Sequence, residues 1–109
     1  MKDVVFIDSA QDDLRTFPPK ARREAGYQID RVQQGRDPSD WKPMGTVGAG
    51  VREIRIREEG EHRVLYVARF DEAIYVLHAF RKKSQKTART DIELARRRYQ
   101  ALNNARKLR

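Results

Sequence analysis

Hydrophobic residues follow strand spacing in the middle of this chain and helical spacing toward its two ends. A short apolar run at residues 4–7 predicts an edge strand near the start. Farther on, segments rich in β-branched and aromatic residues predict three consecutive strands, at residues 51–57, 63–70 and 73–82. Their short connections, of which Glu58-Glu59-Gly60-Glu61 is the clearest turn, predict an antiparallel meander.

Helical spacing predicts three helices, at residues 11–16, 19–34 and 91–105. Ser9 is placed to cap the first, and Thr90 with Glu93 matches a capping box at the start of the third. Prolines and glycines within residues 36–50 predict an irregular loop, with Trp41 expected in the core. The predicted order is β-α-α-β-β-β-α. This is an α+β fold in which an N-terminal strand and a helical hairpin pack on an antiparallel β-meander, followed by a C-terminal helix.

Composition restricts the class of protein. We expect a single domain over residues 1–109. The absence of cysteine excludes disulfides and thiolate metal sites, and with only two histidines neither a metal nor a small-molecule cofactor is expected. No segment approaches the ~20 apolar residues that span a bilayer, and the first residues do not resemble a signal peptide. We therefore expect a cytoplasmic protein without a membrane partner.

Positive charge is concentrated in the last quarter of the chain. Residues 1–80 contain 13 Lys or Arg and 14 Asp or Glu, a net charge of −1. Residues 81–109 contain 11 and 2, a net charge of +9. This asymmetry indicates a polyanionic partner, most simply nucleic acid, with an acidic protein as the alternative.

The last expected strand runs directly into a cluster of cations. The residues that follow its apolar part can bind phosphate through charge and hydrogen bonds: Lys82, Lys83, Gln85, Lys86 and Thr87. If helices cover one face of the sheet, strand alternation leaves Arg55, Arg57 and Arg63 on the open face. Planar guanidiniums fixed on strands can each hold a phosphate through two oxygens. We therefore expect a cationic hollow on the open face, next to this basic segment.

Three segments of the chain resemble toxins of the RelE/ParE superfamily, most closely its phage-derived HigB-type branch. They are WKPMGTVGAGVREIRIREE (41–59), HRVLYVARF (62–70) and IYVLHAFRKKSQKTARTDIELARRRY (74–99). The resemblance covers nearly the whole chain and implies the toxin of a type II toxin–antitoxin system. Such a toxin is a metal-independent mRNA endoribonuclease that acts in the ribosomal A site of translating ribosomes and inhibits translation. The partners implied are mRNA, the ribosome and a cognate antitoxin with a helix-turn-helix domain, and no cofactor is implied.

The resemblance and the charge pattern together suggest roles for individual residues. Arg63 with Arg55 would stabilise charge on the scissile phosphate, and Lys82 or Lys83 would transfer a proton, because neighbouring like charges lower a lysine's pKa. RNA contacts are expected from the remaining basic and polar residues, Lys86, Gln85, Thr87, Arg57, Arg96, Arg97 and Arg98. Ala88 replaces a proline that is frequent in the family. Apart from Tyr99, no histidine or tyrosine follows the basic segment, so the general base is not assigned.

Two further residues are assigned to the core, and three other functions remain open. His78 and Tyr66 lie within apolar strands and are interpreted as core residues rather than catalytic ones. A ParE-like gyrase poison would trap cleaved DNA and cut no RNA. A non-catalytic basic nucleic-acid-binding module would show salt-dependent binding without product. A toxin whose chemistry has decayed would not arrest growth when induced.

Overall fold

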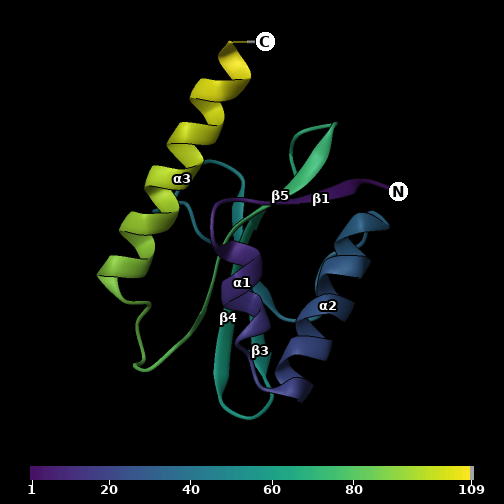
Figure 1. The fold of residues 1–109 in the computed structure, drawn as a ribbon, viewed down its shortest axis with the longest axis vertical. Coiled ribbons are helices and arrows are strands. Elements are labelled where there is room, and N and C mark those ends of the chain that lie inside the picture. Colours follow the sequence, from purple (N-terminus) through teal and green to yellow (C-terminus); the bar gives the residue numbers. More distant parts are fainter. Residues whose placement is uncertain (109) are drawn as a thin grey trace.

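The protein folds into a five-stranded sheet with helices on both faces (Figure 1). The computed structural model describes residues 1–108. The strands lie in the order β1-β5-β4-β3-β2, with bounds Asp3–Phe6 (β1), Trp41–Pro43 (β2), Val51–Arg57 (β3), Glu61–Val67 (β4) and Ala73–Arg81 (β5). The helices are α1 (Ala10–Arg15), α2 (Pro19–Gln33) and α3 (Arg89–Lys107). The predicted α+β fold is confirmed.

Strand pairing brings the two arginine-bearing strands into direct register. β3, β4 and β5 form the antiparallel meander, and β1 joins its edge parallel to β5. Arg55 lies directly opposite Arg63, and Arg63 lies opposite Phe80 on its other side. A bulge interrupts the pairing of β4 with β5 beside Leu65, and it re-aims His78 toward α3. Arg55 of β3, Arg63 of β4 and Phe80 of β5 therefore lie side by side at one end of the sheet.

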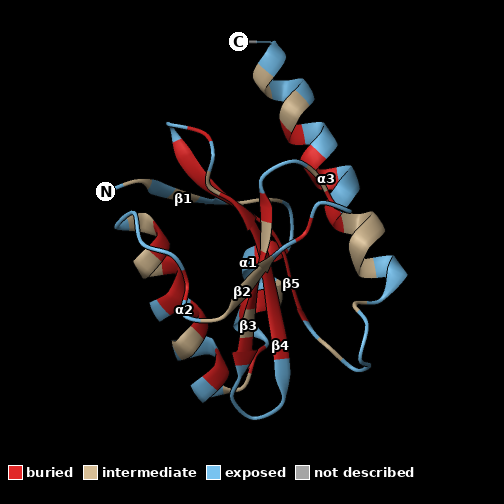
Figure 2. Cartoon of the chain, turned by 180° about the vertical axis from the view of Figure 1, so that it is seen from behind, coloured by how far each residue is buried: buried red, intermediate tan, exposed pale blue. Residues whose placement is uncertain are grey.

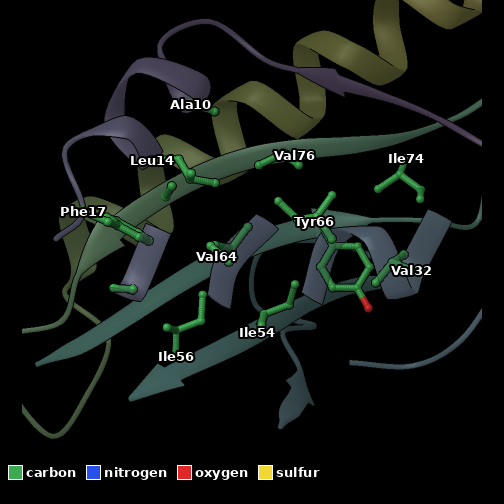
Figure 3. Close-up of a cluster of buried hydrophobic side chains, with 14 residues drawn as sticks. Ala10, Leu14, Phe17, Val32, Ile54, Ile56, Val64, Tyr66, Ile74 and Val76 are labelled. Carbon is green, nitrogen blue, oxygen red and sulfur yellow. The ribbon is translucent and has the colours of Figure 1, made fainter. Parts of the chain in front are cut away.

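The first face of the sheet is covered by α1 and α2. Buried residues of these helices, such as Leu14 and Val32, and Phe17 between the helices pack on alternate strand residues such as Ile54 and Val64 (Figure 3). α2 follows from its sequence: alanines and aliphatic residues recur on one side, and Pro19 occupies its first turn, where no backbone N–H is needed. This layer is the apolar core expected for the helical hairpin.

α3 and the turn before β3 cover much of the opposite face. Leu65, Leu77 and Tyr99 lie in this second apolar cluster. The Tyr99 ring packs directly on Gly48 and leaves no room for a Cβ there. Figure 2 shows the buried residues concentrated in the central strands, with exposed residues at the turn after β3 and in the segment after β5. These two exposed segments lie at the same end of the sheet, because His62 of β4 pairs with Arg81 of β5.

Residues 36–50 are more regular than their composition predicted. Residues Trp41–Pro43 form β2 and pair antiparallel with β3. Trp41 is half-buried with the Arg52 guanidinium 4.0 Å above its ring, so the expectation that it fills the core was wrong. Met44 and Val47 are the buried residues of this segment that enter the apolar cluster under α3. Pairing with a neighbouring strand here overrides local propensity.

Neither predicted side-chain cap forms. Ser9 precedes α1, but its hydroxyl donates to Asp13 Oδ2 at 2.9 Å rather than to a backbone group. α3 begins at Arg89, one residue before Thr90, and Glu93 accepts a hydrogen bond from Arg89 Nε at 2.9 Å. The carboxylate of the expected capping box is thus used in a surface ion pair one turn into the helix.

Candidate functional site

One depression, at the end of the sheet where β4 begins and β5 ends, collects residues from β4 and from the segment that follows β5. We call residues 82–88 the basic loop. The depression has a volume of about 510 Å³ and is lined by Glu61, Arg63, Lys82, Lys83, Ser84 and Gln85. Four of these were singled out from the sequence, Arg63, Lys82, Lys83 and Gln85. Strand register explains the convergence, because the start of β4 lies beside the end of β5.

Arg63 is held in place by contacts on every side of its guanidinium. Its side chain is only 4% exposed, on the face opposite α1 and α2. Nη1 donates to the carbonyl of His62 at 2.9 Å, and Nη2 donates to Glu61 Oε1 at 3.0 Å. Its Nε lies 3.6 Å from Glu53 Oε1. Arg63 is thus a pre-positioned cation with two carboxylates beside it.

Glu53 is a buried carboxylate at the centre of these cations, and the sequence analysis missed it. Its side chain is 0% exposed and comes from β3. Oε2 accepts a hydrogen bond from Thr87 Oγ1 at 3.0 Å, and Oε1 lies 3.8 Å from Lys42 Nζ. Glu53 therefore connects the basic loop, β2 and Arg63. The available signal was the spacing of Glu53 two residues before Arg55, which places both side chains on one face of β3.

The surroundings of the depression lower the pKa of two residues that line it, Lys82 and Glu61. Partial burial lowers the pKa of Lys82, the charge of Arg63 lowers it further, and Glu53 opposes both. The hydrogen bond from Arg63 lowers the pKa of Glu61, so this half-exposed carboxylate stays ionised at neutral pH. A lysine that loses its proton more readily and an ionised carboxylate thus share one hollow with a fixed guanidinium.

A family model described as phage-derived protein Gp49-like (DUF891) matches residues 12–100. The chain belongs to this Gp49-like family. A search of curated proteins finds no match. The Gp49-like family is toxin-like and is often associated with toxin–antitoxin systems, which suggests an antitoxin as a partner.

The other predicted residues of β3 and the basic loop are distributed around the depression of the Gp49-like chain. Arg55 Nη1 lies 3.5 Å from Asp40 Oδ1, and Arg57 Nε lies 3.6 Å from the other oxygen of the same carboxylate. Thr87 is engaged with Glu53, whereas Gln85 and Lys86 are exposed. Cationic side chains therefore gather at this end, but Arg63 is buried rather than on an open face, and internal carboxylates neutralise part of the charge.

The three consecutive arginines of α3 have different environments. Arg98 is buried: Nη1 donates to the carbonyl of Leu77 at 2.9 Å, and Nη2 donates to Ser9 Oγ at 2.9 Å. It connects α3 to the sheet and is removed from the candidate RNA contacts. Arg96 donates two hydrogen bonds to the carbonyl of Thr46 and so fixes the turn before β3. Arg97 is exposed and remains a candidate contact.

His78 and Tyr66 are both buried, in agreement with their assignment to the core. His78 Nε2 lies 2.7 Å from Asp91 Oδ1 of α3, and its ring stacks on Phe80 with centroids 4.8 Å apart. The bulge in β5 makes this contact possible, and it anchors the start of α3 just after the basic loop. Within residues 1–108, no group of three or more His, Cys, Asp or Glu is arranged to hold a metal ion, and no helix is long and apolar enough to cross a membrane.

Proposed function

We propose that this chain is the toxin of a type II toxin–antitoxin system, of the RelE/ParE superfamily, and that it cleaves mRNA on translating ribosomes without a metal ion. The observation that carries the proposal is the shared depression, in which Arg63, Lys82 and Lys83 meet beside an ionised carboxylate. Phosphodiester cleavage by the neighbouring 2′-hydroxyl needs a proton acceptor, a stabiliser of phosphorane charge and a proton donor. The residues that line the depression offer a candidate for each of these roles.

Roles follow from the protonation states. Glu61, ionised at neutral pH, accepts the proton of the 2′-hydroxyl as the 2′-oxygen bonds to phosphorus. Arg63 stabilises the added negative charge on the phosphorane, because a fixed guanidinium needs no reorganisation as that charge develops. Lys82 donates its proton to the 5′-oxygen as the bond from phosphorus to that oxygen breaks. The products are a 2′,3′-cyclic phosphate and a 5′-hydroxyl end.

Binding of the phosphate also requires an exchange of partners. Glu61 Oε1 lies 3.0 Å from Arg63 Nη2, and its side chain is 46% exposed. A phosphate that takes over this guanidinium nitrogen frees Glu61 for the adjacent 2′-hydroxyl. Glu53 is 0% exposed and keeps Arg63 in place during the exchange. The mRNA, the ribosome and a helix-turn-helix antitoxin are the partners in this proposal.

The test is transcript cleavage by the purified protein with translating ribosomes. We expect Arg63→Gln and the Lys82→Ala/Lys83→Ala pair each to lower the cleavage rate at least about 100-fold, the usual loss when an oxyanion-stabilising or proton-transfer group is removed. Arg23→Ala, an exposed cation on α2, is the matched charge control and should cleave at the wild-type rate. Wild-type cleavage by both site variants would reject the proposal. Trapping of cleaved DNA in a gyrase assay, with intact transcript, would identify a gyrase poison instead.

A further inference from the structure

A second concave surface lies at the end of the sheet away from the basic loop. One depression of about 350 Å³ lies between the end of α2 and the neighbouring strand ends, and its lining includes Lys2, Val32, Arg36, Arg52, Tyr66 and Arg69. Another of about 390 Å³ is lined by Arg69, Asn103, Arg106 and Lys107. Because Arg69 belongs to both, the two depressions adjoin. We call them together the distal surface.

Aromatic rings support the arginines of the distal surface. The Arg52 guanidinium lies 4.0 Å from the centroid of the Trp41 ring. Those of Arg69 and Arg106 lie 4.7 Å and 3.7 Å from the Phe70 ring. Stacking restrains a guanidinium without neutralising it, and its N–H edge stays available to an anion.

The floor of the first depression contains a buried hydroxyl whose proton has no acceptor. Tyr66 is 1% exposed, and its polar neighbour is the guanidinium of Arg52, which can only donate, so within residues 1–108 no group accepts the Tyr66 proton. Figure 3 shows this hydroxyl beside Val32, at the edge of the apolar cluster and directed away from its centre. Burial raises the pKa of Tyr66, which keeps the hydroxyl a donor. An unsatisfied buried donor beside a cation indicates that an anionic acceptor belongs there.

The surroundings favour a carboxylate on an apolar stem over a chain of phosphates. Val32 and Ala68 supply apolar lining between the cations. Asp37 Oδ1 lies 2.9 Å from Arg52 Nη1, and Glu72 Oε2 lies 2.7 Å from Arg106 Nε. Each carboxylate therefore already occupies one side of its arginine. The successive phosphates of a nucleic acid would lie close to these two carboxylates and be repelled by them. Acidic side chains that are spaced along a peptide can avoid the two carboxylates. Two adjoining depressions also provide more length than one small molecule requires.

We propose that the distal surface binds an acidic, partly apolar segment of a partner protein, with one carboxylate over the Tyr66 hydroxyl and Arg52 and another over Arg69 and Arg106. That this partner is the antitoxin rests on the proposed function; the preference for an acidic segment does not. The surface is separate from the depression at the basic loop, because Arg52 and Tyr66 pair near the opposite ends of β3 and β4 from Arg55 and Arg63.

The experiment uses the ¹⁵N-labelled full chain and two capped synthetic peptides, Ac-Glu-Leu-Glu-Glu-Leu-Glu-NH₂ and its counterpart with Gln at every Glu. We expect the acidic peptide to shift amide signals of residues 32–37, 50–52 and 66–70, and to bind at least about tenfold more tightly than the Gln peptide. The Arg36→Gln/Arg69→Gln pair should weaken binding by a similar factor. Arg23→Gln together with Lys20→Gln, which removes the same charge from α2, should not.

Tyr66→Phe gives the sharpest result, because it separates a binding role from a structural one. Loss of an unsatisfied hydroxyl should leave the melting temperature unchanged or higher, while the affinity for the acidic peptide falls about tenfold. Wild-type affinity in this variant, equal binding of the Gln peptide, or shifts confined to the basic loop would each overturn the inference. Stronger shifts of the same signals by a single-stranded RNA oligonucleotide would overturn it as well. No ribosome enters this assay, so a failure of transcript cleavage would reject the proposed function alone.

Discussion

Arginines occupy both ends of the sheet, but different neighbours hold them. At the basic loop, Arg63 is 4% exposed and lies beside Glu53, which is 0% exposed. At the distal surface, Arg52 is 38% exposed, lies on the ring of Trp41 and pairs with Asp37, which is 67% exposed. A buried carboxylate fixes and partly neutralises its cation, whereas an aromatic face fixes a cation without neutralising it and a solvent-exposed carboxylate neutralises it only weakly.

This difference suggests what each end can bind. At the basic loop an incoming phosphate must displace an internal carboxylate, which selects a ligand that carries enough charge to compete with Glu61. At the distal surface the guanidinium edges are partly open, and a single carboxylate can bind without a rearrangement of the core. Under the two proposals, the same residue type serves chemistry at one end and recognition at the other.

The largest expected effect comes from the carboxylate beside Arg63. Glu53→Gln leaves the buried guanidinium without its buried counter-charge, which should lower the free energy of unfolding by about 3–5 kcal/mol. The hydrogen bond from Thr87 to this side chain should also weaken, because a neutral amide is a poorer acceptor. Urea unfolding monitored by circular dichroism measures the loss.

Asp37→Asn provides the matched comparison at the distal surface. The substitution breaks the ion pair with Arg52. Because Asp37 is 67% exposed, the unfolding free energy should change by less than about 1 kcal/mol. Equal losses in the two variants would show that burial does not distinguish the two ends. A destabilised Glu53→Gln variant that still cleaves transcript would show that Arg63 needs no positioning by Glu53.

Strand alternation and turn signals predicted most of the fold and the place where cations converge. Apolar runs located the meander, and alternation put Arg55 and Arg63 on one face, as their direct pairing shows. Apolar runs and the alternation of side chains both depend on residues that are close in sequence. β2 was not predictable, because its three residues become a strand only by pairing with β3.

Burial of charged residues depends on contacts between distant segments. Arg98 was grouped with two exposed arginines, yet it is buried because Ser9, 89 residues away, and Leu77 accept its hydrogen bonds. Glu53 is enclosed because the basic loop folds back and Thr87 donates to it across 34 residues. Neither contact leaves a periodic signal in the sequence.

A smaller effect should distinguish the two ends by pH. The hydrogen bond from Arg63 lowers the pKa of Glu61 below its ordinary value of 4.5, so this pair stabilises the protein fully above about pH 4.5 and loses its contribution as pH falls through the folded-state pKa. The hydrogen bond from Arg106 lowers the pKa of Glu72 to about 2, so that pair should persist to lower pH. Urea midpoints from pH 7 down to pH 3 measure both.

The comparison is made with two isosteric variants. Glu61→Gln should differ from wild type at neutral pH by up to about 1 kcal/mol, a limit set by solvent screening of this half-exposed pair, and the difference should vanish on acidification. The difference for Glu72→Gln should outlast it toward low pH. If both differences disappear over the same pH range, the two ends hold their carboxylates equally strongly.

The smallest effect tests the aromatic support directly. Arg52→Lys keeps the positive charge but loses the planar stack on Trp41, which should lower the unfolding free energy by about 0.5 kcal/mol. Arg63→Lys should lower it by about 1.5–3 kcal/mol, because an ammonium cannot reproduce the buried fork that reaches the His62 carbonyl and Glu61 together. Transcript cleavage should fall only in Arg63→Lys, and affinity for the acidic peptide only in Arg52→Lys. Loss of both activities in one variant would mean that the two ends are energetically coupled through β3 and β4, and that their guanidiniums belong to one extended site.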